Sequence, residues 1–208
     1  MKKLKKGILI VLEGIDGAGK TTQAKILEEK LQQKGYEVVY FQEPSRGKWG
    51  CLIKEKAKFP DSLSPQQELE LFQKDRRENV EKNLKPTLAK KKIIILDRYY
   101  FSTIAYQGAK GLDPDWIRAL NEEFAVRPDL VFILDVAAGK GLKRIENRKK
   151  KDKLFEREEY LVKVREIFKS LKGENIIHLN GEKTQEEISG DIEKIVFDYL
   201  AQVHLSEE

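Results

Sequence analysis

The sequence predicts an α/β fold in which a doubly wound, five-stranded parallel sheet is flanked by helices. The first observation behind this prediction is that short apolar runs alternate with longer helical patterns along the 208 residues. The second is that several of the runs are apolar throughout, as strands are when helices cover both faces of a sheet. Strands are expected at residues 8–12, 38–41, 93–96, 130–134 and 176–179.

Residues at the ends of the helical patterns indicate where helices begin and end. One helix is expected over 20–34, and Gly35 supplies its C-terminal stop. A second begins at Ser64-Pro65, because the serine can cap, the proline suits a first turn and Gln67 completes a capping box. Pro86 lacks the N–H that a helix interior needs, so we expect it to kink or end that helix.

Two further helices are expected to begin at Asp113-Pro114 and at Thr184, which forms a capping-box pattern with Glu187. The last of these helices carries one apolar stripe, made by Ile188, Ile192, Ile195, Val196 and Tyr199. The sequence has no repeat, low-complexity stretch or linker. We therefore expect a single domain over residues 1–208.

The composition favours an anionic ligand and disfavours nucleic acid or a membrane as a partner. The net charge is +5, but the 40 basic residues are mixed with 35 acidic ones and form no aromatic-basic stripe. No segment has the apolar length that crosses a bilayer. Because Cys51 is the single cysteine and the two histidines are scattered, we expect neither a disulfide nor a metal cluster, and a cytoplasmic location.

A phosphate-binding motif follows the first expected strand. Residues 14–21 read GIDGAGKT, which satisfies G-x-x-x-x-G-K-[ST] between an apolar strand and a helical pattern. The glycines let backbone N–H groups surround phosphate oxygens, Lys20 adds a charge on the β- and γ-phosphates, and the Thr21 hydroxyl can hold Mg²⁺. A glycine-rich turn without function is the weaker interpretation, because both flanking elements are present. The residues expected to bind ATP are Gly14, Asp16, Gly17, Ala18, Gly19, Lys20, Thr21 and Thr22.

The end of the third expected strand indicates a second ligand. A regulatory GTPase would carry D-x-x-G after a strand and an N-K-x-D motif, and neither occurs here. The third strand ends instead in Asp97-Arg98, at the carboxyl edge where α/β folds bind ligands. Asp97 can position Mg²⁺ directly or through water, and Arg98 presents a planar charged fork that suits an acceptor phosphate.

Residues 97–107 read DRYYFSTIAYQ, and the pattern D-R-Y-x-x-S-x-x-A-Y-Q resembles the signature of thymidylate kinases. The resemblance extends over most of the chain. It implies transfer of the γ-phosphoryl group of ATP to thymidine 5′-monophosphate (dTMP), with magnesium as cofactor, in a homodimer. A related nucleoside-monophosphate kinase with a different or broader base preference is the first alternative. A nucleotide-binding regulatory switch is the second.

The resemblance also implies roles for residues of the acceptor site. Asp16 is expected to contact the sugar 3′-hydroxyl, Phe72 to stack on thymine, and Arg76, one turn later on the same helix face, to reach the base. Taken alone, Phe72 would more often be a core residue. The full set expected to bind the acceptor is Asp16, Glu43, Pro44, Arg46, Phe72, Arg76, Arg98, Ser102, Tyr106 and Gln107.

One stretch departs from the family pattern. Bacterial thymidylate kinases usually read E-P-G-G-T after the second strand, whereas residues 43–47 of this chain read EPSRG. Arg46 therefore stands where a glycine is usual. It could bind the acceptor phosphate beside Arg98, or it could reshape the pocket and change the choice of base.

A basic segment at about 144–156 resembles the mobile lid of bacterial thymidylate kinases. Because Gly17 occupies the loop position where the human and yeast types carry an arginine, the lid must supply the cation that stabilises the transition state. Arg148 is the leading candidate, and Arg144 is expected against the adenine ring. A charge-rich helix end without function is the alternative. The weaker lid candidates are Lys149, Lys151 and Lys153, and the expected catalytic residues are Lys20, Arg98, Arg148 and Asp16.

Overall fold

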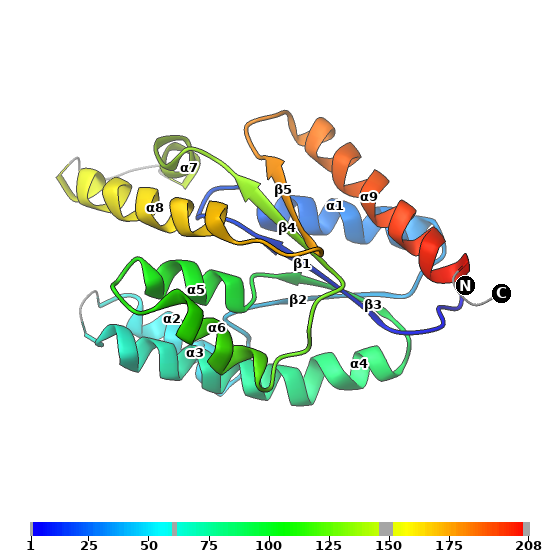
Figure 1. The fold of residues 1–208 in the computed structure, drawn as a ribbon, viewed down its shortest axis with the longest axis horizontal. Coiled ribbons are helices and arrows are strands. Elements are labelled where there is room, and N and C mark those ends of the chain that lie inside the picture. Colours follow the sequence, from blue (N-terminus) through cyan, green and yellow to red (C-terminus); the bar gives the residue numbers. More distant parts are fainter. Residues whose placement is uncertain (1, 60–61, 146–151, 206–208) are drawn as a thin grey trace.

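The computed structural model describes residues 2–59, 62–145 and 152–205. Its strands are β1 (Ile8–Glu13), β2 (Val38–Gln42), β3 (Ile93–Asp97), β4 (Leu130–Asp135) and β5 (Ile176–Asn180). They form a parallel sheet in the order β2-β3-β1-β4-β5, with helices on both faces (Figure 1). The fold class and the five strands predicted from the sequence are confirmed.

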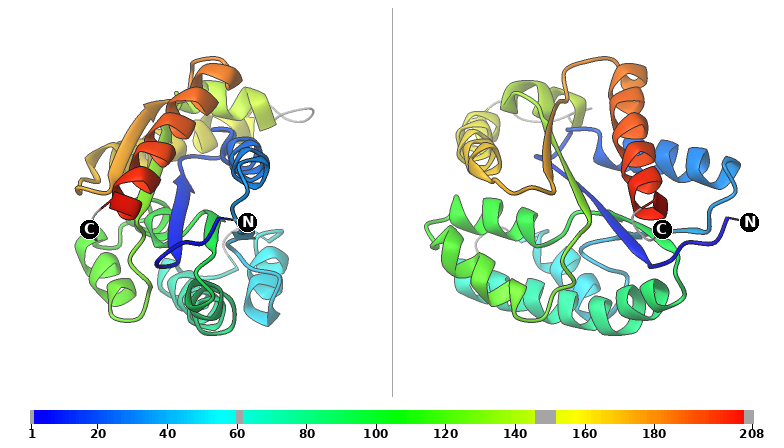
Figure 2. Two further views of the ribbon diagram at one scale, coloured as in Figure 1. Left: turned by 90° about the vertical axis from the view of Figure 1, so that its right-hand side faces the viewer. Right: turned by 45° about the vertical axis from the view of Figure 1, so that its right-hand side comes forward.

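Helices cover both faces of this sheet. They are α1 (Lys20–Gln33), α2 (Lys48–Lys56), α3 (Pro65–Asn79), α4 (Lys85–Ala89), α5 (Tyr100–Gly108), α6 (Pro114–Glu122), α7 (Ala138–Ile145), α8 (Asp152–Ser170) and α9 (Gln185–Leu205), with a π-helical turn, η1 (Val80–Leu84), between α3 and α4. Helices α1 and α9 pack together on one face, while α3, α5 and α8 lie on the other (Figure 2). None of the described helices is long and apolar enough to cross a bilayer.

The central strands make the core of the molecule. Every residue of β1 and β3 is buried, and so is every residue of β4 except the last. The edge strand β2 is half-buried along its whole length, and β5 at the other edge has two exposed positions, His178 and Asn180, among half-buried residues. The uniformly apolar runs in the sequence therefore mark the strands that have neighbours on both sides.

The predicted helix caps are present. Ser64 Oγ accepts a hydrogen bond from the Gln67 amide at 3.2 Å, and the Gln67 side chain accepts one from the Ser64 amide at 2.9 Å. Thr184 and Glu187 form the same reciprocal pair at the start of α9. Asp113 caps α6 by accepting from the amide of Asp115 at 2.9 Å. These pairs satisfy backbone N–H groups that have no partner inside the helix.

Pro86 does not end the helix that contains it. Regular α-helical bonding stops at Asn79, and η1 follows, where the Lys85 amide donates to the Val80 carbonyl in an i to i−5 bond. Helical structure then continues through α4. Lys82, whose carbonyl would clash with the proline ring in a regular helix, lies inside this widened turn. The π turn is thus the way in which the helix accommodates the proline.

The register of the central strands brings the two sequence motifs together. Leu12 of β1 is paired with Asp97 of β3, so both strands end at the same level of the sheet. The chain leaves β1 into the glycine-rich loop at residues 14–19 and leaves β3 into Arg98. The Arg98 amide donates to the Leu12 carbonyl at 3.0 Å, and this bond joins the connection after β3 to the end of β1.

Candidate active site

The glycine-rich loop is held in a shape that needs its glycines. Gly14, Gly17 and Gly19 have φ values of 136°, 79° and 94°, which residues with a side chain rarely adopt. A Cβ at Gly17 would also lie 2.1 Å from the Gly141 carbonyl oxygen. Helix α1 begins directly after the loop, with no side-chain cap and no acidic residue in its first turn. Its N–H groups are therefore available to an anion.

Lys20 points back over this loop. Its Nζ donates to the carbonyls of Gly14, at 3.1 Å, and Ile15, at 2.8 Å. Burial lowers the pKa of this ammonium below its ordinary value, and the nearby positive charge of Arg98 acts in the same direction. The carboxylates of Asp16, Asp97 and Glu13 oppose that shift only in part, so a phosphate group in the loop would further stabilise the charged form of the lysine.

A hydroxyl and a carboxylate meet beside the loop. Thr21 Oγ1 donates to Asp97 Oδ2, and the Tyr40 hydroxyl donates to the same carboxylate oxygen at 3.2 Å. These hard oxygen atoms fit a Mg²⁺ ion that is otherwise held by phosphates and water. Among the described residues no three His, Cys, Asp or Glu side chains gather into a metal cluster.

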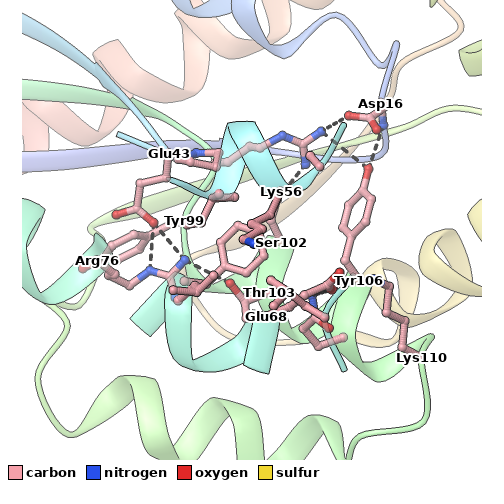
Figure 3. A pocket seen from close by; sticks show the side chains of 18 of the residues that line it. Asp16, Glu43, Lys56, Glu68, Arg76, Tyr99, Ser102, Thr103, Tyr106 and Lys110 are labelled. Carbon is pink, nitrogen blue, oxygen red and sulfur yellow. Dashed lines mark hydrogen bonds and ion pairs between the residues drawn. The ribbon is translucent and has the colours of Figure 1, made fainter. Parts of the chain in front are cut away.

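A cavity of about 300 Å³ opens between α3, α5 and the loop (Figure 3). All the residues expected to bind the acceptor line this cavity except Arg46. They are Asp16, Glu43, Pro44, Phe72, Arg76, Arg98, Ser102, Tyr106 and Gln107. Phe72 is half-buried in the cavity wall and is not among the core residues, so its interpretation as a core residue is not supported.

Arg98 lies at the end of the cavity nearest the phosphate loop. Its guanidinium donates to Ser102 Oγ at 2.8 Å and pairs with the Asp16 carboxylate. The Tyr106 ring lies beside it, and the Tyr106 hydroxyl accepts from the Asp16 amide at 3.0 Å. Arg98 has a φ of 70°, a left-handed conformation that is unusual for a residue with a side chain. Strain of this kind persists only where the surroundings hold it.

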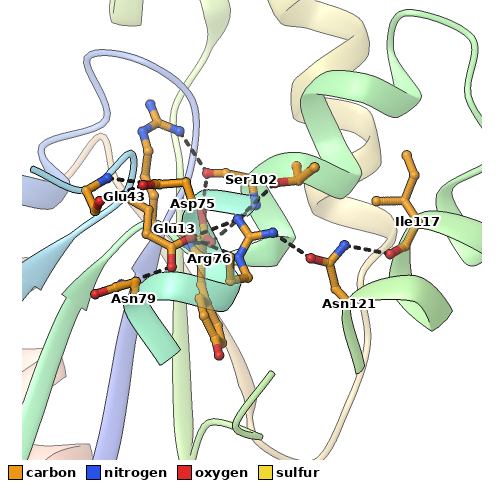
Figure 4. A network of polar contacts seen from close by, with 12 residues as sticks. Glu13, Glu43, Asp75, Arg76, Asn79, Ser102, Ile117 and Asn121 are labelled. Carbon is orange, nitrogen blue, oxygen red and sulfur yellow. Dashed lines mark hydrogen bonds and ion pairs between the residues drawn. The ribbon is translucent and has the colours of Figure 1, made fainter. Parts of the chain in front are cut away.

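Arg76 is fixed in a buried polar network (Figure 4). It is 1% exposed and donates to Glu43 at 2.8 Å, to Thr103 at 3.0 Å and to Asn121 at 2.6 Å. Burial raises the pKa of the Glu43 carboxyl, and the charge of Arg76 opposes that shift. Asn121 also donates to the Ile117 carbonyl at 2.7 Å, which orients its amide oxygen toward the arginine. No sequence pattern pointed to Asn121, because a buried amide in a helix forms no motif.

Arg46 lies apart from Arg98. It is exposed and lines a second hollow, between β2 and α3, together with residues such as Glu78 and Lys82. The preceding residue, Ser45, is buried and anchored to Asp75 through its amide at 2.7 Å and its hydroxyl at 2.5 Å. The structure therefore does not bring Arg46 to the acceptor cavity, either to bind a phosphate or to reshape the cavity wall.

The segment expected to form a lid is described only in part. Arg144 donates to the carbonyls of Gly17, at 3.3 Å, and Gly181, at 3.4 Å, so it lies at the phosphate loop. Arg148, Lys149 and Lys151 lie outside the described residues. Helix α8 follows, and its Tyr160 lines the acceptor cavity and donates to the Tyr106 carbonyl at 2.8 Å. Sequence reasoning missed Tyr160, since a single tyrosine in a charged helix carries no pattern.

Comparisons with known proteins agree with this arrangement. A family model described as "Thymidylate kinase" matches residues 12–192. The chain is 44% identical to the "Thymidylate kinase" of Akkermansia muciniphila over 91% of both chains. It is 42% identical to the "Probable thymidylate kinase" of Archaeoglobus fulgidus, over 93% of this chain and 96% of that protein. It is 46% identical to a "Thymidylate kinase" of Xanthomonas campestris pv. campestris, over 82% of this chain and 75% of that protein.

Proposed function

The chain belongs to the thymidylate kinase family, and we propose that it transfers the γ-phosphoryl group of ATP to dTMP, giving dTDP. One observation supports the proposal above all. The ends of β1 and β3, in register, hold a phosphate loop and a cavity-lining arginine side by side. A donor and an acceptor nucleotide bound there would have their phosphates adjacent, which is what direct phosphoryl transfer requires. The similarity to thymidylate kinases favours dTMP over a broader choice of acceptor.

The proposed reaction needs no general base. The second pKa of a phosphate monoester lies near 6, so the attacking oxygen of dTMP is already an anion at neutral pH. The protein's work is to position two nucleotides and to neutralise charge. Lys20 and the amides of the loop hold the ATP phosphates, and Arg98 holds the acceptor phosphate. The Asp16 carboxylate binds the sugar 3′-hydroxyl. Because that carboxylate pairs with Arg98, the hydroxyl must either share it with Arg98 or replace Arg98 as its partner.

Magnesium is the proposed cofactor, with Thr21 and Asp97 as the residues that hold it. When bound, Mg²⁺ neutralises negative charge on the ATP phosphates. Support for the assignment comes from the hydroxyl and carboxylate oxygens that meet beside the loop. Tyr40 also donates to Asp97, which keeps one oxygen of that carboxylate oriented.

The lid over residues 144–156 is proposed to cover the bound nucleotides, with Arg148 as the cation of the transition state and Arg144 near the adenine. Support comes from Gly17, which provides no side chain at the loop position, and from the contact of Arg144 with the Gly17 carbonyl. We also propose a single domain that works in the cytoplasm as a homodimer. The lone Cys51 supports the location, and membership of the family supports the dimer.

The acceptor methyl group provides a first test. With saturating ATP and Mg²⁺, we expect dTMP to be converted to dTDP, and dUMP to react with a kcat/KM about fivefold lower. The reason is that dUMP lacks only the 5-methyl group, whose burial is worth about 1 kcal/mol. Separation of the nucleotide products by chromatography measures both rates. Failure to form dTDP would refute the proposed function.

A further inference from the structure

Glu13 ends β1, immediately before the phosphate loop, and the proposed reaction gives it no part. Its side chain is fully buried, at 0% exposure. One carboxylate oxygen accepts from the amide of Tyr99 at 2.7 Å and from the amide of Ser102 at 3.2 Å. The other accepts from Ser102 Oγ at 2.6 Å. A buried carboxylate costs free energy unless such donors satisfy it, so this arrangement calls for an explanation.

The three donors all belong to the start of α5. Tyr99 precedes the first residue of that helix and offers no side-chain cap of its own. Glu13 therefore does from a neighbouring strand what a capping residue does at a helix start: it accepts from N–H groups of the first turn, although the Ser102 amide also donates to the Tyr99 carbonyl at 3.1 Å. Its negative charge is also favourable at the positive end of the helix. Glu13 thus fixes where α5 begins relative to β1.

Ser102 extends this contact to Arg98. The hydroxyl donates its one proton to Glu13 and accepts from Arg98 Nη1 at 2.8 Å. The direction of both bonds is fixed, because an arginine can only donate and a carboxylate can only accept. Figure 4 shows Ser102 beside Glu13 in this network. The side chain of Arg98 is therefore linked to a fully buried carboxylate through one hydroxyl group.

The backbone of Arg98 is held by the same strand. Its left-handed conformation, with φ at 70°, has an anchor on each side. The Arg98 amide donates to the Leu12 carbonyl at 3.0 Å, and the next amide, of Tyr99, donates to Glu13. Leu12 and Glu13 are consecutive residues of β1, so one strand end holds two consecutive amides of the connection after β3.

We propose that Glu13 is a positioning residue: through Tyr99 and Ser102 it holds Arg98 in the backbone conformation and side-chain orientation in which Arg98 binds the acceptor phosphate. This inference rests on the proposed function, because it takes Arg98 to be the residue that holds that phosphate. It requires Glu13 as a carboxylate. A glutamine whose amide oxygen kept the two backbone bonds would direct its N–H₂ group at Ser102 Oγ, and the Ser102 hydroxyl would then have no acceptor for its own proton.

Burial and the neighbouring groups act on the Glu13 carboxyl in opposite directions. Burial raises its pKa to about 7, although the hydrogen bond from Ser102 and the positive charges of Arg98 and Lys20 oppose that shift. Each hydrogen bond that Glu13 makes is one in which it accepts.

The test compares Glu13→Gln with Glu29→Gln, a matched change at an exposed position on α1. For Glu13→Gln we expect the KM for dTMP to rise about tenfold or more, the size of effect that a lost hydrogen bond to a charged group has. The KM for ATP should change less than twofold. Glu29→Gln should leave both values unchanged. Ser102→Ala removes the hydroxyl group that joins Glu13 to Arg98 but leaves the hydrogen bond from the Tyr99 amide to Glu13. This variant should also raise the KM for dTMP, and it should fold even if Glu13→Gln does not.

A double-mutant cycle separates positioning from general damage to the fold. In an Arg98→Ala background, Glu13→Gln or Ser102→Ala should change the KM for dTMP less than twofold further, because the arginine that they position is gone. The inference is overturned if either change adds its full effect in that background, or if neither changes the KM for dTMP in the parent protein. The proposed function fails separately, if the parent protein does not phosphorylate dTMP at all.

Discussion

Replacing Lys20 with alanine is expected to lower kcat by about a thousandfold while the protein stays folded. The ammonium group is placed to neutralise charge on the transferring phosphoryl group, and removal of one such group typically costs 10²- to 10³-fold. The loop should keep its shape, because its three glycines with positive φ determine the turn. Burial lowers the pKa of Lys20, which means that the fold disfavours its charge, so its removal should cost little stability.

The measurements for this variant are kcat with dTMP and the thermal unfolding temperature. Lys25→Ala is the matched control, since Lys25 is an exposed lysine on the same helix, α1. The control should keep normal activity and normal stability. A folded Lys20→Ala protein that turns over at the parent rate would show that the glycine-rich loop does not bind the donor phosphates.

Replacing Arg98 with alanine is expected to lower kcat/KM for dTMP by about 10- to 150-fold. This range corresponds to the 1.5–3 kcal/mol that a hydrogen bond to a charged group contributes. The KM for ATP should change little, because the loop and α1 make the donor site. Asp16 and Ser102 lose their partner in this variant, but Asp16 keeps a side chain that is 41% exposed and can be solvated.

Arg98→Lys distinguishes charge from shape at the same position. Lysine keeps the positive charge but loses the planar fork that binds a phosphate through two parallel bonds, so it should restore only part of the activity. The decisive comparison is between the KM for dTMP and the KM for ATP in the two variants. If the KM for dTMP stayed constant while ATP binding collapsed, the donor and acceptor sites would be exchanged.

Local signals predicted much of the fold and of the site. The central strands β1, β3 and β4 have uniformly apolar sequences because helices cover them, and the caps at Ser64, Asp113 and Thr184 follow from short patterns. The loop and the residues after β3 could be assigned to one site, because parallel strands end at a common edge. Helices α2, α5 and α8 were not predicted. Helices α2 and α5 begin without a side-chain cap, and α8 begins in a charged segment.

Contacts between distant segments could not be predicted. Arg76 was expected to reach the base, but its burial between Glu43, Thr103 and Asn121 depends on three other elements of the fold. Arg46 was expected at the acceptor site, either beside Arg98 or in the pocket wall, and its position instead follows from the anchor between Ser45 and Asp75. No sequence pattern pointed to Glu13, since its partners lie 86 and 89 residues away along the chain.

The choice of acceptor tests the account most directly. The comparison is of kcat/KM for dTMP, dCMP, dGMP and UMP with the unsubstituted protein under one ATP–Mg²⁺ condition. In the proposed site Phe72 stacks on the base, Arg76 reaches its polar edge and Tyr106 crowds the sugar 2′ position, and all three line a cavity of about 300 Å³. We therefore expect dTMP to react fastest, and the purine and the ribonucleotide to be excluded sterically. A higher kcat/KM for dGMP or UMP than for dTMP would contradict the assignment of the acceptor.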